Sequence, residues 1–273
     1  DLNSALFKKF LDWSKDRQLK GKPVGNATIN KALALLKSIC KSAAIDFGWG
    51  GSYDPFFGWK KLKEDDSYEH VHPFTLHEQQ QLIAAMPAHW MPYFKFAFAT
   101  GVRIGEQIAL KPGDIDWLKG EVCISRAITY DHEGRIIEGA TKNHFSRRTL
   151  PRLPGMMEAL KAQESIYRQF NGEYFFCNTV GGRIDNANLY HQVWIPALKR
   201  AALEPRELRQ TRHTFASLAL AFGETPGFVS KIMGHRDTEM IFKVYCKFVA
   251  DAGASRDGES LAKAYGKVFG KEE

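Results

Sequence analysis

The hexapeptide Arg-Gln-Thr-Arg-His-Thr at residues 209–214 sets two arginines three positions apart, at the start of an apolar segment. On a helix, Arg209 and Arg212 would lie one turn apart on the same face. A guanidinium is permanently charged and offers two parallel donors, which suits a phosphate or a carboxylate. A solvated helix start is the alternative, because exposed arginines need no ligand.

Four further residues could act on a phosphate together with these arginines. Arg103 stands at a predicted helix start in Thr-Gly-Val-Arg-Ile-Gly-Glu, and Lys142 lies on a predicted turn between two strands. His235 follows a predicted helix end, and Tyr245 comes ten positions later. Each has an ordinary structural explanation when taken alone, such as an ion pair, a solvated lysine or a packed aromatic ring. Their order along the chain is therefore the informative feature.

Length and composition indicate a globular protein of two domains. The chain has 273 residues, with 44% apolar and 25% charged residues, and this length favours more than one core. No apolar run approaches the roughly 20 residues of a membrane helix, and no signal peptide is evident, so we expect a cytoplasmic protein without membrane contact. Because the sequence starts at Asp1, we also expect the gene product to extend upstream.

The charge distribution suggests an anionic partner. The formal net charge is +7, and residues 1–63 carry twelve lysines and arginines against five aspartates. Such an excess is typical of a nucleic-acid-binding surface. The four cysteines are scattered, without the spacing of a zinc site, so reduced thiols and no metal are expected.

Two helices are predicted before residue 60, over residues 5–19 and 27–47. Asn26 is one of two candidate N-caps for the second helix. Lys37 and Lys41 fall on its polar side. The opposite, apolar face is predicted to be buried, and its residues recur at three- and four-residue steps: Ile29, Leu33, Leu36, Cys40, Ala43 and Phe47.

A polar stretch closed by a proline separates this helical part from the rest of the chain. We predict a helical domain over residues 1–65, a linker over 66–74 and a larger domain over 75–273. The larger domain opens with a capping box formed by Thr75 and Glu78.

The larger domain is predicted to be helical around one small sheet. Residues 120–129, 135–141 and 146–152 alternate in polarity and predict a three-stranded antiparallel sheet. The fold class is thus mainly α with a small antiparallel β-sheet (α+β). Helices are predicted over residues 75–87, 90–101, 154–170, 186–203, 213–223 and 225–234. A tail helix carries an apolar stripe of Leu261, Tyr265, Val268 and Phe269.

Over roughly residues 75–250, the ordered motifs resemble the tyrosine recombinase family, also called the phage integrase family. They are Thr-Gly-Val-Arg-Ile-Gly-Glu, Thr-Lys-Asn-His-Phe-Ser-Arg-Arg-Thr-Leu-Pro, Arg-Gln-Thr-Arg-His-Thr-Phe-Ala-Ser, Met-Gly-His and a tyrosine. The preceding segment is similar to the family's core-binding domain, which contacts DNA. The resemblance implies a catalytic domain over residues 75–273 and a core-binding domain over 1–65.

The resemblance implies a role for each candidate residue. Tyr245 matches the nucleophile, which becomes linked to a DNA 3′ phosphate, and Arg103 and Arg212 match the arginines that hold its nonbridging oxygens. Glu106, one turn after Arg103, could orient that arginine. His235 matches a residue that donates to the phosphate or assists deprotonation of the tyrosine. On the hairpin, Lys142 resembles the acid that protonates the leaving 5′ oxygen.

The sequence departs from the family pattern at Arg209, where most members have histidine. Arginine cannot act as a base, so any base at this position must be replaced by His235 or water. If the position only stabilises phosphate charge, Arg209 can serve, and this is the interpretation we favour. We expect His213 to be structural, because adjacent helical residues point in different directions.

The resemblance further implies a site-specific recombinase or integrase that needs neither metal nor ATP and acts on double-stranded DNA. A homotetramer on DNA and DNA-bending accessory proteins are implied partners, and the tail helix could pass to a neighbour or pack in its own subunit. Lys31, Lys37 and Lys41 are the candidate DNA-binding residues of the helical domain. Two alternatives remain open: a topoisomerase of the type IB class, and a non-enzymatic DNA-binding regulator.

Overall fold

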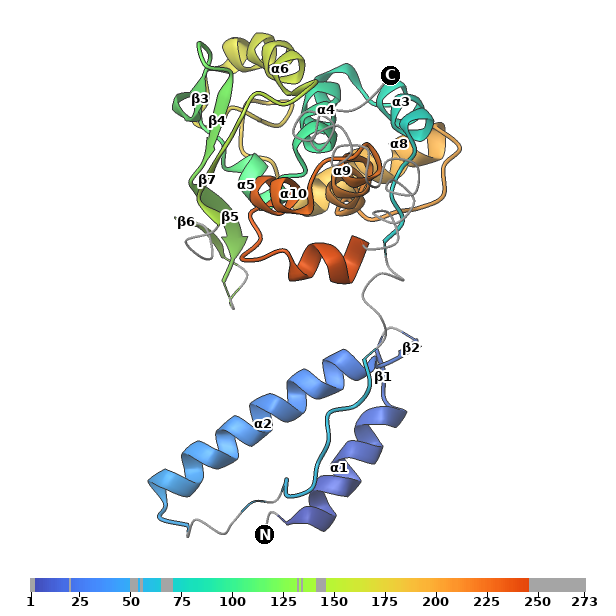
Figure 1. The fold of residues 1–273 in the computed structure, drawn as a ribbon, viewed down its shortest axis with the longest axis vertical. Helices are drawn as coiled ribbons and strands as arrows, with labels where there is room; N and C mark the ends of the chain where they lie inside the picture. The colour runs from blue at the N-terminus through green and yellow to red at the C-terminus, as the bar shows by residue number, and fades with distance from the viewer. Residues whose placement is uncertain are drawn as a thin grey trace, which may run out of the picture. The chain divides into compact units, whose positions relative to one another are not determined.

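A computed structural model of the chain describes these residues: 3–19, 21–49, 54, 56–64, 71–131, 133, 135–140 and 146–245. It divides into two compact units, residues 1–69 and 70–273 (Figure 1). The first unit is helical, and the second combines helices with short antiparallel strands. The predicted fold class is therefore confirmed. None of the helices in the described part is both long and apolar enough to span a membrane.

The first unit is built on two helices, α1 (Ser4–Asp16) and α2 (Asn26–Asp46). A hairpin of two-residue strands, β1 (Gln18–Leu19) and β2 (Lys22–Pro23), joins them (Figure 1). The Asn3 side chain accepts hydrogen bonds from the first backbone N–H groups of α1, so it acts as an N-cap.

Residues 56–64 run back along α2 and are fixed by asparagine side chains. Asn30 is buried, and it exchanges hydrogen bonds of 2.9 Å with the backbone of Leu62. The Asn26 amide donates to the Lys63 carbonyl at 2.7 Å. The prediction of Asn26 as an N-cap is therefore wrong: Gly25 caps α2 without a side-chain bond, because the Asn26 side chain is engaged by a segment 37 residues away.

The core of the first unit covers mainly the N-terminal half of α2. Phe7, Ile29, Leu33 and Phe56 are buried together. Phe47 is 73% exposed, so its predicted burial is wrong. Among the described residues, none of the buried side chains packs against the last turn of α2. The apolar pattern of the sequence therefore extends further along the helix than the core does.

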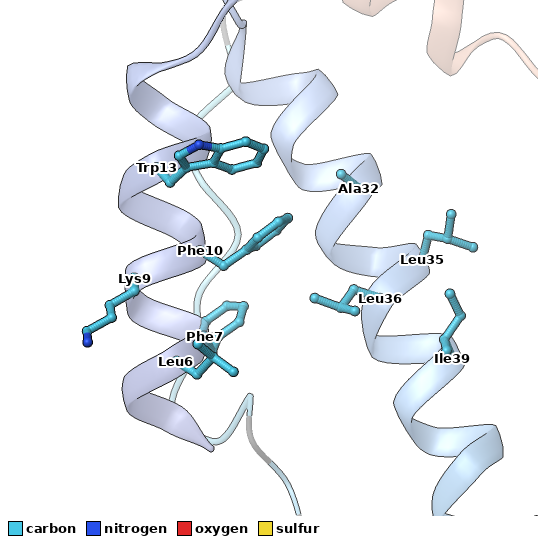
Figure 2. Close-up of a pocket in the computed structure, with 9 residues that line it drawn as sticks. All are labelled: Leu6, Phe7, Lys9, Phe10, Trp13, Ala32, Leu35, Leu36 and Ile39. Atoms are coloured by element: carbon cyan, nitrogen blue, oxygen red, sulfur yellow. The ribbon is translucent and has the colours of Figure 1, made fainter. Parts of the chain in front are cut away.

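An apolar groove of about 640 Å³ lies between α1 and α2. Figure 2 shows the rings of Phe7, Phe10 and Trp13 projecting from α1 toward α2, with Leu36 pointing back toward them. The groove is lined by Leu6, Phe7, Lys9, Phe10, Trp13, Ala32, Leu35, Leu36 and Ile39. Several of these side chains are largely exposed, unlike those of the core.

The helices of the second unit enclose two clusters of buried hydrophobic side chains among the described residues. They are α3 (Leu76–Ala84), η2 (Ala88–Trp90), α4 (Met91–Thr100), α5 (Ile104–Ile108), η3 (Pro112–Asp114), α6 (Met156–Phe170), α7 (Asn186–Asn188), η5 (Leu189–Trp194), α8 (Ile195–Arg200), α9 (Gln210–Ala221) and α10 (Pro226–Met233). Residues 239–245 are also helical. The predicted capping box at α3 is confirmed, with both reciprocal bonds between Thr75 and Glu78.

Helix α4 is the centre of the larger cluster, because most of its side chains are buried. The Phe94 ring stacks on Trp194 with a centroid separation of 5.1 Å, and Phe74 meets the same indole edge-on. Arg206 lies over the Phe74 ring, 4.3 Å from its centroid, and forms an ion pair with Glu78. These contacts connect α3, α4 and the segment before α9 into a rigid support for the site.

The described strands of the second unit form two sheets rather than the predicted single three-stranded sheet. One contains β3 (Ile115–Asp116), β4 (Glu121–Ile124) and β7 (Arg148–Leu150), and the other pairs β5 (Arg126–Tyr130) with β6 (Ile136–Ala140). The predicted first strand divides because β5 packs against α5. A Cβ at Gly105 of α5 would lie 2.4 Å from the Ile128 carbonyl oxygen, so the two backbones are in direct contact.

Candidate active site

One cleft of about 480 Å³ brings together four of the predicted site residues, Arg103, Arg209, Arg212 and His235. They come from the start of α5, the start of α9 and the loop after α10. These positions are separated by up to 132 residues of sequence. Arg236 also lines the cleft, which therefore concentrates four guanidinium groups and favours binding of an anion.

Arg212 is held at the floor of the cleft by backbone carbonyls. Its Nη1 donates to the Gly101 oxygen at 2.6 Å, and its Nη2 donates to the Met233 oxygen at 2.8 Å. Burial, followed by the nearby charge of Arg103, lowers the pKa of Arg212 to about 9. The guanidinium is still charged at neutral pH, and its described side-chain partners include no carboxylate. Its charge is therefore available to an anion in the cleft.

Two glycines with positive φ allow the backbone to reach these arginines. Gly101 ends α4 with φ +60°, and a Cβ there would lie 2.5 Å from the Phe215 ring. Gly234 ends α10 with φ +66°, and a Cβ there would lie 2.8 Å from Arg148 Nη1. Any side chain at either position would combine backbone strain with a steric clash.

Glu106 organises the arginines behind the cleft. Its Oε1 accepts from Arg103 Nη1 at 2.7 Å, and its Oε2 accepts from Arg148 Nη2 at 2.9 Å. Burial raises the pKa of Glu106, but the charge and hydrogen bond of Arg148, together with Arg103, outweigh burial and leave the pKa below its ordinary value. Arg103 is 42% exposed. Glu106 therefore orients Arg103, while part of that guanidinium still faces the cleft.

His235 is neutral at physiological pH. Burial, followed by the charges of Arg212 and Arg103, lowers its pKa to about 4. Its Nε2 lies 3.0 Å from Arg212 Nη2, which can only donate, so this nitrogen is the acceptor and Nδ1 carries the hydrogen. Nδ1 is buried and has no hydrogen-bond partner in the described part of the chain.

Tyr245 is packed behind the cleft and is not among its lining residues. Its side chain is 2% exposed, in a cluster with Val71, Ala216 and Met233. Burial raises the pKa of Tyr245 to about 12, against the opposing charges of Arg212 and Arg209. The hydroxyl lies 2.6 Å from Nδ1 of His213. The phenol is thus adjacent to the arginine cluster but enclosed.

Of the two remaining predicted catalytic residues, Arg209 belongs to the described part of the chain and Lys142 does not. Arg209 is exposed at the cleft and forms no ion pair with any described residue. Lys142 lies outside the described residues, as does the predicted tail stripe at 261–269. In the described part of the chain, no three histidine, cysteine, aspartate or glutamate side chains gather as they would around a metal ion.

A family model now identifies the chain. Residues 73–250 match the model of the phage integrase family, which is more than half of the 273 residues. The chain belongs to the phage integrase family. The sequence motifs that predicted this family all begin within the matched region.

Relatives of this integrase-family chain are found among bacterial proteins. It is 30% identical to the prophage integrase IntR of Escherichia coli K12 over 85% of this chain and 59% of IntR. It is 28% identical to a XerC-like tyrosine recombinase of Caldanaerobacter subterraneus over 64% of this chain and 50% of the relative. The chain thus spans only about half to three fifths of the length of these relatives.

Solved structures of integrases share the fold. The Tn1549 transposon integrase in complex with transposon right end DNA matches with a TM-score of 0.75 and 18% identity, covering 96% of this chain and 86% of that one. A lambda integrase tetramer bound to a Holliday junction matches with a TM-score of 0.62 and 18% identity, covering 94% and 67%. At such low identity, these matches establish the fold of this integrase-family chain.

A second hollow adjoins the cleft of this integrase-family chain, and we call it the basic hollow. It measures about 600 Å³ and shares His235, Arg236 and Asp237 with the cleft. Its other lining residues are Arg147, Arg148, Thr149, Gly227, Ser230, Lys231 and Thr238. Arg147, Lys231 and Arg236 form no ion pair with described residues. Positive charge therefore continues from the cleft across α10.

Sequence reasoning missed the roles of two side chains in the site. Arg148 is 9% exposed and ties Glu106 to the Ile232 carbonyl of α10. The only sequence signal for Arg148 was its position in the Ser-Arg-Arg-Thr stretch of the hairpin motif. His213 was expected to be structural, yet it contacts the Tyr245 hydroxyl. Arg212 donates to the carbonyls of Gly101 and Met233, whereas its neighbour His213 contacts the helix that carries Tyr245.

The three lysines predicted to bind DNA are all exposed on α2. Lys37 and Lys41 are one turn apart and share a face. Lys31 is six residues before Lys37, so it emerges about 120° around the helix from it. The three are therefore spread over about 120° of the exposed side of α2 and do not form a single stripe.

Proposed function

We propose that this chain is the core of a site-specific DNA recombinase or integrase that cuts and rejoins DNA through a 3′-phosphotyrosine intermediate, without metal or ATP. The observation that carries the proposal is the convergence of Arg103, Arg209 and Arg212 with His235 on one cleft, directly in front of Tyr245. A XerC-like tyrosine recombinase among its relatives and a similar integrase in complex with transposon end DNA support the same function.

The cleft has the properties of a site for a phosphodiester. Arg212 and Arg103 are fixed by carbonyl oxygens and by Glu106, so their donors are oriented before a ligand arrives. Preorganised donors stabilise the charge that develops in a transition state more effectively than mobile ones. In this proposal, Arg209 adds a third positive charge in place of the family's usual histidine. His235, which accepts from Arg212, donates its Nδ1 hydrogen or orients that arginine.

The chemical step joins the Tyr245 oxygen to phosphorus and breaks the bond from phosphorus to the 5′ oxygen. The phenol loses its proton, and the 5′ oxygen gains one from Lys142, which takes the role of general acid. The diester bond energy is retained in the phosphotyrosine linkage, and the reverse reaction reseals the strand. Because Tyr245 is enclosed in the structure, its side chain or its helix must shift toward the cleft for attack.

DNA would be held mainly through its phosphates. The basic hollow extends the cleft along the second unit, and Lys31, Lys37 and Lys41 supply charge on the first unit. Each neutralised phosphate contributes about −0.9 to the slope of log affinity against log salt concentration. Binding by several such residues should therefore weaken steeply with salt. We further propose a homotetramer on two DNA sites, assisted by DNA-bending proteins, acting in the cytoplasm.

Covalent trapping tests the proposal. The protein is incubated with a duplex nicked near the cleavage point, so that the 5′-hydroxyl fragment diffuses away and the adduct accumulates. We expect a protein–DNA adduct with the wild type and none with Tyr245→Phe. No adduct with the wild type, or an undiminished adduct with Tyr245→Phe, would remove the enzymatic function and favour a DNA-binding regulator.

The type IB topoisomerase alternative shares the adduct and needs a second assay. Two duplexes that carry the same site and different end labels are mixed with the protein. A recombinase produces strands that join the two labels, whereas a topoisomerase relaxes supercoiled plasmid and reseals each strand to its own partner.

A further inference from the structure

The hydroxyl of Tyr245, the proposed nucleophile, contacts a histidine that the sequence did not suggest as a base. His213 Nδ1 lies 2.6 Å from the Tyr245 hydroxyl, and the two ring centroids are 5.7 Å apart. The sequence left His235 or water as the base, and His235 uses its one acceptor nitrogen on Arg212. Arg209 has no acceptor at all.

We propose that His213 is the general base of the reaction: its Nδ1 accepts the proton of Tyr245 as the phenolic oxygen attacks phosphorus. This inference rests on the proposed function of the cleft. The contact involves the reacting oxygen itself, so His213 would be a catalytic residue rather than a support. It also accounts for a site in which Arg209 stands where a base is otherwise expected.

The hydrogen-bond geometry fits this direction of transfer. The 2.6 Å contact suits a hydrogen bond from the Tyr245 hydroxyl to Nδ1 of a neutral imidazole, in the tautomer whose hydrogen resides on Nε2. Burial, followed by the charges of Arg209 and Arg212, lowers the pKa of His213 to about 4, so Nδ1 has a free lone pair at neutral pH. A base must be unprotonated before it can act.

The same arginines connect the base to substrate binding. The charges of Arg209 and Arg212 lower the pKa of the His213 imidazole, and both residues also line the cleft. A phosphate bound between them would offset their charge, which raises the basicity of His213 and favours proton uptake. The base would therefore become effective only when a phosphodiester occupies the cleft.

The step balances without a further reactant. The bond from the Tyr245 oxygen to phosphorus forms while the phenolic proton moves to His213 Nδ1. The bond from phosphorus to the 5′ oxygen breaks, and that oxygen takes a proton from the general acid. In the resealing direction, the imidazolium of His213 returns its proton to the departing phenolate.

Two variants separate a base from a hydrogen-bond acceptor. In His213→Asn, the amide oxygen can occupy the place of Nδ1 and accept from Tyr245, but it cannot take up a proton. In His213→Leu, both functions are lost. We expect both variants to form the adduct about 100-fold or more slowly than the wild type, since general bases contribute about 10²–10⁴ in rate. DNA affinity and the circular dichroism spectrum should be retained by His213→Asn.

A substrate with a sulfur in place of the bridging 5′ oxygen distinguishes a defect in activating the Tyr245 nucleophile from a defect in protonating the leaving group. A thiolate leaves without protonation, so this substrate bypasses the general acid and still requires the base. We expect the defect of His213→Asn to persist on the sulfur substrate. The matched control is His77→Asn, an exposed histidine on α3, which should cleave both substrates at the wild-type rate.

Each other outcome overturns the inference. Wild-type rates in His213→Asn would show that accepting a hydrogen bond is sufficient. Recovery of His213→Asn on the sulfur substrate would place its action at the leaving oxygen. If His213→Asn fails to fold, the wild type can be titrated instead: a rate on the sulfur substrate that does not fall as His213 becomes protonated excludes it as the base. Absence of the wild-type adduct would remove the proposed function together with the inference.

Discussion

Arg148 and Glu106 form an ion pair in which Nη2 and Oε2 are 2.9 Å apart and both side chains are almost fully buried, with exposures of 5% and 2%. The pair joins β7 to α5, and the same carboxylate orients Arg103 at the cleft. Removing one member of a buried pair leaves the other charge without compensation.

Replacement of this carboxylate should therefore be costly for the fold. We expect Glu106→Gln to lower the free energy of unfolding by about 3–5 kcal/mol, measured by denaturant unfolding at pH 7. Glu158→Gln is the matched control, because Glu158 pairs with Lys95 on the surface, and an exposed pair contributes less than about 1 kcal/mol. Equal losses in the two variants would contradict a structural role for the buried pair.

The acid sensitivity of the protein should have two stages. The pKa of His213 and of His235 is about 4 in the folded chain, against an ordinary 6.5. Folding thus disfavours their protonated forms, and this stability is complete above pH 6.5 and is lost as the pH falls toward 4. Glu106, whose pKa lies below 4.5, adds a loss at still lower pH.

The histidine stage can be isolated by substitution. We expect His213→Asn to show a smaller loss of unfolding free energy between pH 6.5 and pH 4.5 than the wild type. Denaturant titrations at several pH values measure the difference. His77→Asn should reproduce the wild-type curve, and an unchanged curve for His213→Asn would count against burial of a neutral imidazole at this position.

Neighbouring leucines on α2 should respond very differently to truncation. Leu33 is fully buried, whereas Leu35 is 64% exposed at the apolar groove. We expect Leu33→Ala to cost about 2–5 kcal/mol and Leu35→Ala to cost within about 0.5 kcal/mol. Hydrogen exchange of the α2 amides reports the local stability of this unit. Similar losses at the two positions would mean that the groove is covered in solution.

The basic hollow should contribute to DNA affinity through charge alone. We expect Lys231→Ala to weaken binding about equally for all duplex sequences and to reduce the salt slope by about 0.9. Lys161→Ala, on an exposed part of α6 outside both hollows, should leave the slope unchanged. Fluorescence anisotropy at several salt concentrations distinguishes the two results.

Features set by neighbours in the chain could be predicted from the sequence. The capping box of Thr75 and Glu78 and the end of α4 at Gly101 depend on bonds within a few residues. The family also followed from the sequence alone, since its motifs are read in order along the chain. The catalytic roles of the site residues stay predictions until the trapping experiment is done.

Features that depend on distant segments could not be predicted in this way. The alternating polarity of residues 120–129 fits one continuous strand as well as two short ones. The segment is divided into β4 and β5 because β5 packs against α5. Asn26 has the chemistry of an N-cap, but the Lys63 carbonyl engages its amide.

The sequence by itself determined the family, the helices and the set of residues able to grip a phosphate. The tertiary structure decided which of those residues share a cleft, that Arg148 locks Glu106, and that His213 meets Tyr245. The reason is physical: a local pattern fixes backbone hydrogen bonds and the face on which a side chain emerges. The contact partner of that side chain comes from another part of the chain, and only tertiary packing brings the two together.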